Sequence, residues 1–136
     1  MYGNPTFDCG RAQIHALCRQ LATVVTVEGA IDETNIDRVT AFARRFVLAE
    51  KPFVLDMSLV NSFSRQCVSL LTAIDETCAH VGVEWSLVAC ESVLVAVRAA
   101  GAAIPVAESV PDALHYFADG IDERRRLLPL LTKKTA

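Results

Sequence analysis

The sequence predicts an α/β domain in which about four helices pack on a mostly parallel or mixed sheet of four or five strands. Two neighbouring segments, residues 12–18 and 22–27, have the alternating or β-branched composition of strands and are close enough to form a hairpin. After them, short apolar runs alternate with longer segments whose apolar residues recur at helical spacing. Strands that alternate with helices after an opening hairpin indicate helices packed on a largely parallel sheet.

The first part of the chain, residues 1–11, contains Gly and Pro, and we expect it to be a loose lead-in. The strand predicted at 12–18 alternates apolar and polar residues, which is typical of a strand buried on one face. The strand predicted at 22–27 is rich in Val and Thr, and we expect Gly29 to end it.

A first helix is predicted after this hairpin, because the side chains of Asp32 and Thr34 can both accept hydrogen bonds from the free amides of a first turn. Its apolar residues recur at helical spacing: Ile36, Val39, Phe42, Ala43, Phe46 and Val47. Pro52 marks the restart of the chain. Residues 53–57 are mostly apolar and abruptly bounded, which favours a central strand.

Residues 58–64 are predicted to form a loop, followed by a second helix at 65–81 that Gly82 ends. The remaining predicted elements are a strand at 84–89, a helix at 92–100 capped by Ser92 and ended by Gly101, a strand at 104–107, and a last helix that begins near Pro111. We expect three parts in all: the lead-in at 1–11, one domain at 12–118 and a C-terminal tail at 119–136.

Composition and charge exclude several classes of protein. Of the 136 residues, 52% are hydrophobic, which is too many for a disordered chain. The formal net charge of -3 argues against non-specific nucleic-acid binding, which depends on Lys and Arg. No apolar stretch has the length of a membrane span, and Asp8, Arg11 and Arg19 lie where a signal peptide would be apolar. We therefore expect a soluble, cytoplasmic protein that binds neither nucleic acid nor membrane.

Several segments resemble the motifs of a known family. Residues 24–32, Val-Val-Thr-Val-Glu-Gly-Ala-Ile-Asp, are similar to the family's second strand and its Gly-Glu-Leu/Ile-Asp turn into the first helix. Residues 54–60, Val-Leu-Asp-Met-Ser-Leu-Val, are similar to its Val-Leu-Asp-Leu-Ser-Gly-Val strand. Gly101 and residues 109–114 match two weaker motifs in the same order. Together these matches span about residues 12–118 and resemble the STAS domain, the fold of bacterial anti-sigma factor antagonists.

The resemblance implies a role in transcription regulation. Antagonists of this family bind an anti-sigma factor, often one that is also a serine kinase, and release the sigma factor that it holds. Their switch is a serine in an Asp-Ser-Ser-Gly motif at the start of the second helix, and its phosphorylation abolishes binding. The free amides and positive dipole end of a helix N-terminus make that position sensitive to a phosphate.

This chain departs from the family at the switch. The motif falls on Ser64, Arg65, Gln66 and Cys67, so Arg65, which has no hydroxyl, occupies the phosphoserine position. Cys67 replaces the motif's glycine, and we expect it to be a small buried side chain.

Three interpretations of the altered switch stay open at this point. The switch is lost and Arg65 is a solvated surface residue; or Arg65 contacts an acidic surface of the partner; or the switch has moved to Ser64, which is also placed to cap the helix. The residues expected to bind the partner are Asp32, Ser62, Ser64, Arg65 and Gln66. Asp32 is included because the resemblance places it in the loop after the second strand, near the start of the second helix.

Other functions remain as alternatives. A STAS-like sensor or scaffold that binds a small ligand or a multi-protein complex is the second hypothesis, and a homodimer is a further alternative. No catalytic residue is predicted, because Cys67 and His80 lie more than three helical turns apart. No metal or cofactor is predicted, because no His or Cys pair has ligand spacing. A redox switch between Cys9 and Cys18 is a minor alternative. Four leucines within residues 127–131 could pack on the domain or bind a partner.

Overall fold

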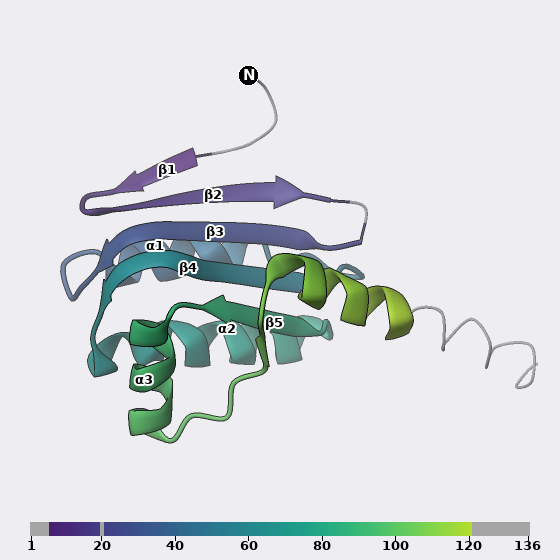
Figure 1. Ribbon diagram of the computed structural model, residues 1–136. Coiled ribbons are helices and arrows are strands. Elements are labelled where there is room, and N and C mark those ends of the chain that lie inside the picture. The colour runs from purple at the N-terminus through teal and green to yellow at the C-terminus, as the bar shows by residue number, and fades with distance from the viewer. Residues whose placement is uncertain (1–5, 20, 121–136) are drawn as a thin grey trace, which may run out of the picture.

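A sheet of six strands runs through residues 6–19 and 21–120, the part of the chain that the computed structural model describes (Figure 1). Its strands lie side by side in chain order: β1 (Thr6–Cys9), β2 (Ala12–Cys18), β3 (Thr23–Ile31), β4 (Phe53–Phe63), β5 (Trp85–Ala89) and β6 (Val106–Ala107). β1, β2 and β3 pair antiparallel, and β3 to β6 pair parallel. The sheet is therefore mixed, and the predicted α/β class is confirmed.

Helices cover both faces of this sheet. They are α1 (Ile36–Arg45), α2 (Val68–Val81), which the 3₁₀ helix η1 (Arg65–Cys67) precedes, α3 (Glu91–Ala100), and a last helix described over residues 110–120. In Figure 1, α1 and α2 lie behind the sheet and the last helix crosses in front of it. None of the helices described is long and apolar enough to span a membrane.

The alternation of side chains along the strands divides the apolar residues between two layers. On the side of α1, α2 and α3, the main core includes Val25, Leu55 and Leu87 from three neighbouring strands, all fully buried. On the other side, Val24 belongs to a smaller core with Phe117 of the last helix. Consecutive residues of β3 therefore enter opposite cores, as the two-residue period of a doubly covered strand requires.

The prediction of a loose lead-in at 1–11 is wrong for residues 6–9, which form β1. This strand has four residues and pairs with β2. Its Phe7 ring stacks on the Phe42 ring of α1 at a centroid distance of 5.1 Å. The partner strand and this stacking stabilise a segment too short to be recognised from its own composition. Residues 1–5 lie outside the described part of the chain.

Two strands are longer than predicted. Gly29 does not end β3, because at φ +97° it lies at a register shift and the strand continues to Ile31. A Cβ on Gly29 would lie 2.4 Å from the carbonyl oxygen of Arg11, so this position requires glycine. The predicted loop at 58–64 is also wrong, because β4 continues to Phe63 in parallel with the end of β3.

The helix ends agree with the predictions better than the helix starts do. Gly82 and Gly101 follow α2 and α3 in the left-handed conformation expected of such glycines. The helix predicted at 65–81 begins as η1 and becomes α-helical only at Val68. Ser92 lies inside α3 rather than at its cap.

Candidate functional site

The predicted site is divided between two chain segments that the sheet brings together. β3 and β4 run parallel, and their last residues, Ile31 and Phe63, lie side by side. The residues that follow them, Asp32 and Ser64, therefore leave the sheet at the same edge. Because both strands end here, we call this edge the carboxyl edge of the sheet.

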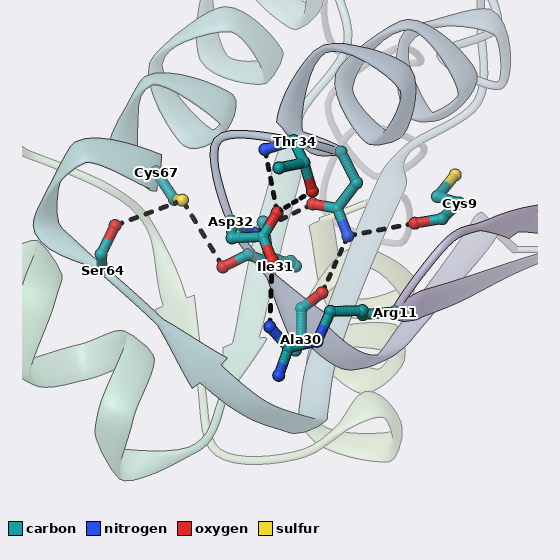
Figure 2. A network of polar contacts seen from close by, with 9 residues as sticks. Cys9, Arg11, Ala30, Ile31, Asp32, Thr34, Ser64 and Cys67 are labelled. Atoms are coloured by element: carbon teal, nitrogen blue, oxygen red, sulfur yellow. Dashed lines mark hydrogen bonds and ion pairs between the residues drawn. The ribbon is translucent and has the colours of Figure 1, made fainter.

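Cys67 joins the two segments, as Figure 2 shows. Its Sγ lies 3.4 Å from the hydroxyl oxygen of Ser64 and donates a hydrogen bond to the carbonyl oxygen of Ile31 at 3.7 Å. The Cys67 side chain is only 2% exposed, which confirms the expected small buried residue. Thiol hydrogen bonds are weak, but this contact packs the start of η1 against the end of β3.

Asp32 organises the loop after β3. One of its carboxylate oxygens accepts hydrogen bonds from the backbone N–H of Thr34, at 2.9 Å, and from the Thr34 hydroxyl. The other oxygen lies 3.5 Å from the exposed guanidinium of Arg11. The Thr34 hydroxyl first, then the Thr34 N–H and the Arg11 charge, hold the pKa of Asp32 below its usual value. Asp32 therefore carries a negative charge at neutral pH.

The predicted caps of α1, Asp32 and Thr34, are wrong. The helix begins at Ile36 with Asn35 at its N-cap position. Instead, the carboxylate of Asp32 accepts a hydrogen bond from the N–H of Thr34, in the loop before the helix. This bond closes a local turn of the kind that Asp favours.

Asn35 is a residue of this region that sequence reasoning missed. Its side-chain amide donates to the carbonyl oxygens of Cys9, at 3.1 Å, and Ala30, at 2.9 Å, and its oxygen accepts from the N–H of Asp32 at 2.9 Å. At 1% exposure, this amide connects the β1–β2 hairpin, the end of β3 and the loop. The sequence does place an Asn just before the apolar residues of the first helix, a position where Asn often caps a helix. Its bond to Cys9 is long-range and could not be read from that signal.

Four predicted residues, Ser62, Ser64, Arg65 and Gln66, are exposed. Together with Asp32 they form what we call the carboxyl-edge surface. Ser64 has an extended backbone at the N-cap position of η1, but its side chain makes no capping hydrogen bond, so the predicted capping role is wrong. Within residues 6–19 and 21–120, Arg65 forms no ion pair. Its guanidinium is exposed at this surface.

The thiols at the N-terminal end do not form a redox pair. Cys9 lies opposite Ala12 at one end of the β1–β2 hairpin, whereas Cys18 ends β2. At a rise of roughly 3.4 Å per residue, the two cysteines are about 20 Å apart, but a disulfide requires Cα atoms within about 7 Å. The alternative of a Cys9–Cys18 switch is wrong for this structure.

The described residues that were considered for metal binding and for catalysis are not brought together either. In the described residues no three His, Cys, Asp or Glu side chains are placed to hold a metal ion. Cys67 lies in η1 and His80 near the end of α2, so the helix separates them. Burial, and then the neighbouring Asp75 carboxylate, raises the pKa of Cys78 to about 12, so this thiol is protonated at neutral pH.

Comparisons with known proteins agree with this architecture. The family model described as the STAS domain matches residues 13–113. Osmosensory protein A of Mycobacterium tuberculosis (strain ATCC 25618 / H37Rv) is 43% identical over 96% of this chain and 87% of its own length. A serine-to-glutamate variant of RsbS from Moorella thermoacetica has a similar structure, with a TM-score of 0.68 and 16% identity over 80% of this chain and 97% of its own. An anti-sigma factor antagonist from Mycobacterium paratuberculosis has a TM-score of 0.57 and 20% identity over 79% and 94%.

Proposed function

This chain belongs to the STAS domain family, and we propose that it is an anti-sigma factor antagonist. In this proposal it binds an anti-sigma factor in the cytoplasm, displaces the sigma factor that is held there, and regulates transcription by binding alone, without catalysis. The carboxyl-edge surface is the proposed contact. One solved structure with a similar fold is that of an anti-sigma factor antagonist, which suggests the kind of partner.

The observation that carries the proposal is the exposure and position of Arg65. It is exposed at the start of η1. The resemblance of the sequence to the family implies that this is the position where antagonists carry their phosphoserine. A fixed guanidinium can bind a carboxylate of the partner through two parallel hydrogen bonds. Asp32 places a negative charge on the same surface. A surface with both charges selects a partner by complementarity, and Arg65 cannot be switched off by phosphorylation.

A displacement assay tests this proposal. Each anti-sigma factor encoded in the same genome is loaded with its sigma factor, and the full chain is added. We expect release of the sigma factor from at least one of these complexes, and less release with Arg65→Ala. The matched control is Arg45→Ala, because Arg45 is an exposed arginine at the opposite end of α1 from Asp32. Failure to release any sigma factor would contradict the proposal.

Phosphorylation at Ser64 is the remaining route to a switch, and it is separately testable. Ser64 is exposed, so a kinase can reach its hydroxyl, and a phosphate there would lie beside Arg65. We propose that the usual switch is absent and expect no phosphate on Ser64 after incubation with an anti-sigma factor of the kinase type and ATP. Mass spectrometry of the intact chain and of its peptides makes the measurement. Phosphate on Ser64 would show that the switch has moved.

A second candidate function is a STAS-like sensor or scaffold subunit. It is favoured by the name of the relative with 43% identity, Osmosensory protein A. The two candidates differ in the displacement assay, because a scaffold would join a complex without releasing a sigma factor. Binding of an anti-sigma factor together with its sigma factor would favour the scaffold.

A further inference from the structure

A second surface of the molecule is a groove between α2, the β5–β6 edge of the sheet and the last helix. It has a volume of about 600 Å³, within the range of specific binding pockets. Most of its wall is apolar and includes Val83, Trp85, Pro105, Val106, Ala113 and Tyr116. Two of these side chains are strongly exposed for apolar residues, Val106 at 49% and Tyr116 at 65%. We call it the β5–β6 groove.

Acidic side chains lie next to the apolar wall of this groove. Asp75 and Glu84 line the β5–β6 groove, and an adjoining hollow shares Glu84 and adds Glu50 beside Lys51. The indole N–H of Trp85 donates to the Asp75 carboxylate at 2.9 Å, which holds that charge against the wall. The groove therefore suits a ligand that is apolar in one part and cationic in the next.

We propose that residues 124–131 of this same chain, Arg-Arg-Arg-Leu-Leu-Pro-Leu-Leu, dock in the β5–β6 groove. The sequence has the composition that the groove requires, because three arginines immediately precede four leucines. The proposed pairing places the arginines at the acidic rim formed by Glu50, Asp75 and Glu84, and the leucines on the wall that contains Trp85. Pro129 suits a non-helical segment lying in a groove.

The length of the chain permits this docking. Residues 121–136 lie outside the described part of the chain and follow the last helix, which is described through residue 120. Tyr116 lines the groove and lies about one helical turn, roughly 5.4 Å, before residue 120. The seven residues from there to Leu127 can span up to about 25 Å. The leucines can therefore return to the groove without any change in the sheet or helices.

The inference does not depend on the proposed function. The β5–β6 groove includes Trp85, the first residue of β5, and so lies near the amino ends of the parallel strands. The carboxyl-edge surface lies where those strands end. Either proposal can fail while the other holds.

Nuclear Overhauser measurements on the full chain test the docking. Trp85 is the single Trp of the sequence, so its indole signals are unambiguous. We expect cross-peaks between that indole and methyl groups of the leucines at 127–131. The absence of any such cross-peak overturns the proposal. In a mixture of Leu-labelled and Trp-labelled chains, cross-peaks between different molecules would identify a second copy as the occupant, and would overturn docking within one chain.

Two pairs of variants test the chemistry of the contact. Arg124→Glu with Arg125→Glu should weaken the cross-peaks, whereas the same charge change in Lys133→Glu with Lys134→Glu should leave them intact. Leu130→Glu with Leu131→Glu should remove the cross-peaks of these two side chains to the Trp85 indole and weaken those of Leu127 and Leu128. Leu59→Glu, at an exposed leucine that does not line the groove, is the control. If the arginine or leucine variants had the same effect as their controls, the assignment of these arginines and leucines to the groove would be overturned.

Discussion

The Cys67 thiol donates a hydrogen bond to the carbonyl oxygen of Ile31 across 3.7 Å, and so connects the turn before α2 to the end of β3. The two residues are far apart in the sequence, but the parallel pairing of β3 with β4 makes them neighbours. Through this contact, the loop that holds Asp32 and the turn that holds Arg65 are packed as one unit.

Replacement of Cys67 should lower stability in proportion to the disturbance of this packing. Cys67→Ala removes a small buried side chain and should lower the free energy of unfolding by about 1 kcal/mol. Cys67→Leu adds volume at a 2% exposed site and should cost about 1–3 kcal/mol. Urea denaturation makes the measurement, with the exposed Cys18→Ala as control, expected within about 0.5 kcal/mol of the parent. Equal stability of all three variants would refute the packing role.

Asn35→Ala should be strongly destabilising. The substitution leaves the buried carbonyls of Cys9 and Ala30 without the amide that they accept from. Lost buried hydrogen bonds of this kind cost about 1–3 kcal/mol each, so we expect about 2–4 kcal/mol in all. Thermal and urea unfolding check the value. Asn61→Ala is the control, because Asn61 is exposed and its replacement should change little.

Gly29→Ala separates a steric clash from backbone strain. Gly29 and Gly82 both have positive φ, at +97° and +86°. A Cβ on Gly29 would meet the Arg11 carbonyl oxygen at 2.4 Å, whereas a Cβ on Gly82 would meet nothing within 4 Å. Gly82→Ala should therefore cost about 1 kcal/mol, the strain alone. Gly29→Ala should cost clearly more in the same denaturation experiment, and a smaller loss than that of Gly82→Ala would contradict the close approach.

The carboxyl group of Asp32 should titrate with a pKa below the usual value of about 3.9. Because the Thr34 hydroxyl is the largest cause of the shift, Thr34→Val should raise this pKa towards its usual value. Thr72→Val, at a threonine of α2 whose hydroxyl bonds Val68, should not. Carbon-13 NMR of the Asp32 carboxyl group follows both titrations.

The sign of the accompanying stability change is fixed by the direction of the shift. A carboxyl group whose pKa is lower in the folded state stabilises that state at pH values above the unfolded pKa. This contribution is lost as the pH falls through the folded pKa of Asp32. Thr34→Val should therefore reduce stability at neutral pH and have less effect in acid. A larger effect in acid would contradict the assignment.

The sequence predicted most of the strands and helices because their periodicity is local. The apolar stripe at 36–47 and the glycines at 82 and 101 needed no knowledge of neighbouring elements. β1 was missed because pairing and the contact between Phe7 and Phe42 stabilise it. The end of β4 was predicted as a loop because it pairs with the end of β3, which lies beyond Gly29, where that strand was predicted to end.

The candidate site was predictable only in part for the same reason. The motif positions selected Asp32 and residues 62–66, and the structure places the ends of β3 and β4, which carry them, at one edge of the sheet. Asn35 and the hydrogen bonds of Cys67 depend on contacts across long sequence separations. Their importance could be recognised only once the strands were placed side by side.

The affinity of the full chain for an anti-sigma factor, compared between Arg65→Ala and Arg45→Ala, tests the central claim most directly. Biolayer interferometry against the anti-sigma factors of the same genome gives the equilibrium constants. We expect one of them to bind the unphosphorylated chain, Arg65→Ala to weaken that binding about tenfold or more, and Arg45→Ala to leave it unchanged. Equal affinities of the two variants, or no binding to any anti-sigma factor, would contradict the assignment of the carboxyl-edge surface.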